Sequence, residues 1–242
     1  MTTDTRNIAW AVAVLIATLA FFGATWIVPD FGGFDPDQYP VQQIDPPIVP
    51  AGYTFAIWGV IYIWLLVSAS FGLGQRATAG DWADMRPALS LSLVVGASWL
   101  PVAKQSALAA SVLIWAMLIP ALLALFRAPL LDRWWARAPL GLYAGWLSAA
   151  SFVALGTTLA GWGVMGEVQA ALLCIAAALV LAAIVQVALE GVPEYGIAAT
   201  WAFVGIVVGN LSGGAFIVLL AALVGAVVMA LLALRAATLT RA

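Results

Sequence analysis

Long runs of apolar residues recur along the whole chain, and short polar segments separate them. A helix that crosses the hydrocarbon core of a bilayer needs about 20 mainly apolar residues. The runs are continuous and do not alternate between apolar and polar residues, which argues against the strands of a membrane barrel. The pattern therefore predicts eight helical spans, near residues 8–28, 52–71, 87–103, 107–126, 140–160, 169–189, 195–210 and 214–234. The seventh span is the weakest, because it is short and only residues 211–213 separate it from the eighth.

The composition supports the same fold class, an all-α integral membrane protein. Of the 242 residues 65% are hydrophobic and 8% are charged, whereas soluble domains have roughly 45–50% apolar and about 25% charged residues. The chain has no histidine and one cysteine, Cys174. This inventory excludes a disulfide framework, a His- or Cys-ligated metal centre and a Ser-His-Asp or Cys-His catalytic set, so we expect no metal site and no enzyme. The net charge of −2 and the scattered basic residues argue against nucleic-acid binding.

The positions of the basic residues predict which ends of the spans face the cytoplasm, where Lys and Arg gather. With eight spans and both termini in the cytoplasm, the outer segments hold only Lys104. The inner segments then hold the other basic residues, which are Arg6, Arg76, Arg86, Arg127, Arg133, Arg137, Arg235 and Arg241. We therefore expect a multi-pass protein of the inner or plasma membrane with both termini in the cytoplasm.

The connection at residues 29–50 differs from the other loops. It contains half of the twelve prolines and four aspartates, and it has no basic residue. Proline fixes the backbone, so this loop is stiff, acidic and expected on the non-cytoplasmic side. Its length suits a lid over a cavity, and an ordinary spacer loop is the alternative.

Aromatic residues are the main chemical signal, with twelve tryptophans in the chain. Phe55, Trp58 and Tyr62 share one face of the second span, and Tyr143 and Trp146 share a face of the fifth. Such stripes either pack between helices or form a cage for a flat apolar ligand, because indole and phenol rings offer stacking faces. No Asp, Glu, Lys or Arg lies well inside a predicted span, so coupling to an ion gradient is not expected.

Two G-x-x-x-G patterns, at residues 141–145 and 205–209, allow helix backbones to approach closely in a membrane. They predict close helix packing, and a homo-oligomer formed through these faces is one possible outcome.

Three motifs in order resemble the TspO/translocator-protein family of tryptophan-rich sensory proteins. In the segment at 50–62, Pro50, Ile57, Trp58, Gly59 and Tyr62 match the family's second-helix signature, while Ala56 replaces a proline. The other two matches are Trp99-Leu100-Pro101, similar to Trp-Pro-Pro in the third helix, and Leu142-Tyr143-Ala144-Gly145-Trp146, similar to Pro-Tyr-x-x-Trp in the fifth.

The resemblance covers roughly residues 1–160 and implies two parts, a TspO-like five-helix membrane unit (1–160) and an additional three-helix segment (161–242). The asparagines that the family usually places in its third and fifth helices are Gly96 and Ala154 here. These two positions therefore lack the polar side chains that the resemblance implies for ligand contacts.

The resemblance further implies a membrane sensor or binding protein for a planar hydrophobic ligand, such as a porphyrin or related tetrapyrrole, with a role in its transport or turnover. No cofactor is required, and with no axial histidine a metal-free porphyrin or an unligated haem is favoured. The candidate ligand-binding residues are Phe55, Trp58, Tyr62, Trp99, Tyr143 and Trp146. Two alternatives remain, a facilitator for an uncharged solute and a structural subunit of a larger membrane complex.

Overall fold

A computed structural model describes residues 2–28 and 32–239, and every regular element in these residues is helical. Arg241, which is predicted to lie on the cytoplasmic side, and residues 29–31 of the predicted lid lie outside the described residues. The long helices are α1 (Thr3–Ile27), α2 (Ile57–Arg76), α4 (Arg86–Ala103), α5 (Ala107–Phe126), α6 (Arg137–Gly161), α7 (Glu167–Ala188), α8 (Pro193–Gly209) and α9 (Phe216–Leu239). The short elements are η1 (Pro36–Gln38), η2 (Gly52–Ala56) and α3 (Gly80–Ala83).

The eight predicted spans correspond one to one with the eight long helices. Seven of the segments described are long and apolar enough to cross a membrane, and the shorter apolar helix α8 is the predicted weak seventh span. The second span differs at its start, since residues 52–56 form the 3₁₀ turn η2 before α2 begins. The predicted all-helical membrane fold is confirmed.

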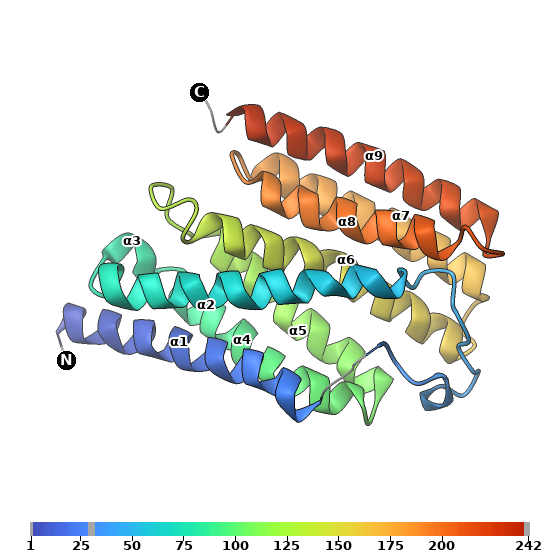
Figure 1. Ribbon diagram of the computed structural model, residues 1–242, viewed down its shortest axis with the longest axis horizontal. Helices are drawn as coiled ribbons and strands as arrows, with labels where there is room; N and C mark the ends of the chain where they lie inside the picture. The colour runs from blue at the N-terminus through green and yellow to red at the C-terminus, as the bar shows by residue number, and fades with distance from the viewer. Residues whose placement is uncertain (1, 29–31, 240–242) are drawn as a thin grey trace.

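Five helices form a closed ring in which each packs on two neighbours. Helix α1 packs against α2 and α4, α5 lies between α4 and α6, and α2 closes the ring against α6 (Figure 1). Helices α7 and α8 pack on α6, and α9 lies against both of them. The ring ends at Gly161 and the three further helices follow it, while the predicted division into two parts at residue 160 stays a prediction.

Small residues on α6 explain why α8 can lie so close to it. A side chain at Gly145 would collide with the backbone carbonyl of Tyr195, and one at Gly141 would reach a Val192 methyl group at 2.6 Å. The start of α8 therefore packs on the first G-x-x-x-G pattern. The loop around residue 50 packs on the second, at Gly205 and Gly209. Both patterns make contacts within the chain, and a homo-oligomer stays a prediction.

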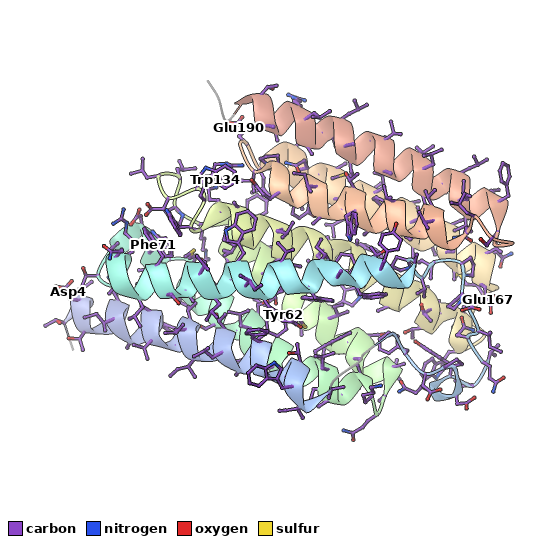
Figure 2. All side chains as sticks on the ribbon, in the orientation of Figure 1. Asp4, Tyr62, Phe71, Trp134, Glu167 and Glu190 are labelled. Atoms are coloured by element: carbon purple, nitrogen blue, oxygen red, sulfur yellow. The ribbon has the colours of Figure 1, made fainter. Side chains whose placement is uncertain are left out.

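The first residues of α1 and the last residues of α9 lie at the same end of the bundle (Figure 1). Figure 2 places Phe71, Trp134 and Glu190 at this end and Glu167 at the opposite end. The described arginines belong to the former end, and Lys104 belongs to the latter, where the loop 32–56 also lies. The arrangement fits an even number of crossings.

Candidate functional site

A cavity of about 210 Å³ lies at the end of the helix ring opposite the termini. Its walls come from η2, α2, α4, α5, α6 and α8 together with the loop that precedes η2. Ten residues of the loop, between Gly32 and Pro50, line the cavity. The loop predicted as a lid therefore lines this cavity over much of its length.

Four of the six predicted ligand residues, Phe55, Trp58, Trp99 and Trp146, line this cavity. Trp146 is central among them, since its ring meets Phe55 at a centroid distance of 6.0 Å and Trp58 at 6.1 Å, both edge to face. The indole of Trp99 donates a hydrogen bond to the carbonyl of Ala110 at 3.0 Å, which fixes its orientation. The arrangement gives the cavity flat aromatic walls on three helices and the preceding turn.

The other two predicted residues, Tyr62 and Tyr143, do not line the cavity. Tyr62 stacks between α2 and α1, with centroid distances of 5.5 Å to both Trp58 and Phe22 (Figure 2). Tyr143 is fully buried and exchanges a hydrogen bond of 2.8 Å with Ser92. These two tyrosines support the cavity wall through packing. The sequence could not predict this, because shared helix spacing does not reveal which neighbour covers each ring.

Phe21 of α1 does not line the cavity, but it packs against the predicted residues, a contact that the sequence reasoning missed. Its ring touches Trp58, Tyr62 and Tyr143, and a Cβ atom at Gly96 would lie 2.8 Å from it. Phe21 thus fills the space in which the family usually has the third-helix asparagine. The fifth-helix position, Ala154, lines the cavity with a methyl group. The site is more apolar than the family motif implies.

Charge is scarce around the cavity. Asp45 is the one charged side chain among the described lining residues, and it is exposed to solvent. Burial raises the pKa of Tyr39, another lining residue, above its ordinary value, so its phenol stays neutral at physiological pH. Within residues 2–28 and 32–239, no group of three or more His, Cys, Asp or Glu side chains could hold a metal ion. The lining suits an uncharged, mainly apolar guest.

Several residues of the site were missed because they come from distant parts of the chain. Phe34 belongs to the loop and meets Trp99 at a centroid distance of 6.2 Å. Ile114 of α5 and Ala202 of α8 complete the lining. Neither carries a chemical signal in the sequence, and only the fold brings them to the aromatic faces.

These features define a multi-pass helical membrane protein with an aromatic-walled cavity beneath a proline-rich loop. The family model described as TSPO-like protein matches residues 7–235, which include all or most of every long helix. The chain belongs to this TSPO-like family. The match continues past residue 160, so it takes in the last three helices as well as the five-helix ring. No curated protein and no solved structure matches the chain.

Proposed function

We propose that the chain is a membrane binding protein and sensor for a planar hydrophobic ligand, held in the cavity beneath the loop 32–50. The observation that carries this proposal is the perpendicular arrangement of Phe55, Trp58 and Trp146 along one lining surface. Aromatic faces and edges in this arrangement favour a flat, weakly polar guest. Membership of the TSPO-like family is consistent with a sensor or binding role.

The cavity volume constrains the ligand. Engineered apolar cavities of about 150 Å³ take up benzene, whereas pockets that enclose drug-sized ligands measure about 300–1,000 Å³. The cavity of about 210 Å³ is therefore large enough for one small ring system. A porphyrin or related tetrapyrrole, the ligand class that the family resemblance implies, requires the loop to move outward so that more of the macrocycle is covered.

Fluorescence titration tests the proposal. Protoporphyrin IX added to the purified protein in nanodiscs should quench tryptophan emission in a saturable way. Trp58→Leu and Trp146→Leu should each weaken binding by about two- to thirteenfold, the equivalent of ~0.5–1.5 kcal/mol of lost aromatic contact. No described residue forms a hydrogen bond with the side chain of either tryptophan, so leucine leaves no protein partner unpaired.

Trp115→Leu is the matched control, because Trp115 is half-buried, packs edge to face on Phe152 at 5.0 Å and lies outside the cavity. Equal effects of all three substitutions would show that the aromatic rings only pack. If a small planar probe such as indole binds and protoporphyrin IX does not bind, the ligand is restricted to a single ring system. Net solute flux in liposomes would support the facilitator, and a stoichiometric co-purifying protein would support the structural subunit.

A further inference from the structure

The loop over the cavity has two halves that are held in different ways. We define the outer half as residues 33–45 and the inner half as residues 46–56. The inner half is attached to α8, which lies outside the five-helix ring. The outer half forms hydrogen bonds with the ends of two ring helices, at Ala103, Lys104 and Gly161.

Three hydrogen bonds join the inner half to α8 and its C-terminal cap. The amide N–H of Ala51 donates to the carbonyl of Gly205 at 2.9 Å. The indole of Trp201 donates to the carbonyl of Thr54 at 2.8 Å, and the side-chain amide of Asn210 donates to the carbonyl of Pro47 at 2.8 Å. These bonds hold both ends of the inner half and its middle.

Glycines form the surface on which the inner half lies. A Cβ atom at Gly205 would lie 2.8 Å from the Pro50 Cβ, and one at Gly209 would lie 3.1 Å from the Val49 carbonyl oxygen. Ile48 is 3% exposed, and its terminal methyl occupies the space above Gly156 of α6. Larger residues at these three glycines would push the inner half away from the helices, so the small residues fix its position.

The outer half is also joined by three hydrogen bonds, but they go to the ends of α4 and α6, where the Tyr39 ring lies over Gly161. The Gln38 side chain donates to the carbonyls of Ala103 and Lys104, both at 3.1 Å, and the Val41 amide donates to the carbonyl of Gly161 at 2.9 Å. Tyr39 and Gln43 are its only buried residues. Both boundaries of this half have positive backbone φ angles, +124° at Gly33 and +49° at Asp45. Asp45 is the one non-glycine residue with positive φ in the described chain, and such positions are candidates for hinges.

We propose that α8 is a positioning element of the ligand site. It holds the inner half as a fixed cavity wall, so ligand enters by movement of the outer half alone. Ala202 of α8 lines the cavity directly, beside the inner-half residues Val49 and Pro50. This inference rests on the proposed function, since it specifies how the ligand reaches the cavity. It also gives α8, one of the three helices that follow the ring, a role in binding.

Two amides provide a matched pair for hydrogen–deuterium exchange. Ala51 and Val41 each donate to a helix glycine carbonyl at 2.9 Å, one in each half. In nanodiscs without ligand, the Ala51 amide should exchange at least tenfold more slowly than the Val41 amide. Trp201→Phe, which removes the bond to Thr54 but keeps an aromatic ring beside Tyr53, should accelerate exchange at Ala51 about fivefold and leave Val41 unchanged. Gln38→Ala should do the reverse.

A thiol inside the cavity links these movements to access. Ala150 lines the cavity, so Ala150→Cys in a Cys174→Ala background gives one reactive position. Gln38→Ala should raise its labelling rate with N-ethylmaleimide about fivefold, whereas Trp201→Phe should change the rate less than twofold. Asn210→Ala gives a second test of the α8 contact, by removal of the bond to Pro47.

Similar exchange at Ala51 and Val41 in the native protein would overturn the proposal, because the loop would then open as one piece. The proposal would also be overturned if Trp201→Phe or Asn210→Ala accelerated labelling of the cavity thiol as much as Gln38→Ala does. Neither experiment contains a ligand. The inference can therefore fail while protoporphyrin IX still binds, and the proposed function can fail while the two halves still differ.

Discussion

At the scale of single residues, Arg86 connects three segments at the end of the bundle where the termini lie. Its Nη1 atom donates to the carbonyls of Asn7 and Ala77, and its Nη2 atom donates to those of Gly72 and Arg76, at 2.7–3.1 Å. Three of these carbonyls belong to the last turn of α2 or its cap, where a positive charge is favourable. The side chain is 1% exposed, so water cannot replace these bonds.

Replacement of Arg86 by methionine should therefore destabilise the fold strongly. Arg86→Met keeps an unbranched side chain but removes the donor to two buried and two partly buried carbonyls, which should lower the free energy of unfolding by about 3 kcal/mol or more. Thermal unfolding in detergent measures the loss. Arg127→Met, at an exposed arginine, is the control and should change stability by less than about 0.5 kcal/mol. Equal melting temperatures for the two variants would contradict a role for Arg86 in holding the segments together.

Asp132 gives a pH-dependent contribution at the same end. It accepts hydrogen bonds from Arg76 at 2.7 and 3.2 Å and from the Trp82 indole at 2.8 Å. The bond from Arg76, above all, holds the pKa of Asp132 below its ordinary value. A depressed carboxyl pKa stabilises the fold above the unfolded-state pKa of about 3.9, and this contribution is lost as pH falls through the lower folded-state pKa.

Asp132→Asn should consequently be less stable than the native protein at pH 7, by a small amount because Arg76 is partly exposed. The difference should shrink as the pH falls below about 3.9. Melting temperatures of both proteins between pH 7 and pH 3 provide the comparison. A difference that stays constant over this range would mean that the carboxylate charge contributes nothing.

At the scale of elements, the contact between α6 and α8 depends on the absence of a side chain at Gly145. An added methyl group would collide with the carbonyl of Tyr195, so Gly145→Ala should cost about 1–3 kcal/mol by overpacking. Gly74→Ala is the matched control, since its Cβ would meet open space and alanine favours the helix by roughly 0.5–1 kcal/mol. Chemical denaturation should give effects of opposite sign, and two neutral substitutions would show that α8 can shift away without cost.

Hydropathy was sufficient to predict the helices but not the environment of their ends. The span predicted at 107–126 matches α5 exactly, because Ser106 caps it and its apolar run ends at Arg127. The hydropathy pattern places Arg86 and Glu194 in polar loops between the spans, yet both side chains are buried at the starts of helices. Glu194 pairs there with Arg133 from the connection between α5 and α6. Such partners lie far apart in sequence, so a local pattern cannot reveal them.

The candidate site was predictable only in part for the same reason. The aromatic spacing placed Phe55 and Trp58 on one face of the second span, but their contacts with Trp146 of α6 depend on the fold. It could not separate cavity walls from packing at Tyr62, whose ring Phe22 covers. The bond from Trp201 to Thr54 joins residues 147 positions apart. The contact between the loop and α8 was therefore not visible in the sequence.

At the scale of the whole molecule, the number of crossings depends on α8. Its 17 residues span about 25 Å at 1.5 Å per residue, somewhat less than the ~30 Å hydrocarbon core. It nevertheless lies between α6 and α9 along the bundle (Figure 1). The residues that precede and follow α8 lie at opposite ends of the bundle. Eight crossings place the start of α1 and the end of α9 on one side.

We predict that this side is the cytoplasm. Seven described arginines belong to the end where α1 begins, and Lys104 belongs to the other; basic loop residues favour the cytoplasmic side. Reporter domains fused after Ala242 and inserted within residues 32–43 should therefore lie on opposite sides, with the former in the cytoplasm. Reporters on the same side would require an even number of crossings between them and would mean that α8 enters the membrane without crossing it. Opposite sides with the C-terminal reporter outside would preserve the fold but reverse its orientation, and the cavity would then open toward the cytoplasm.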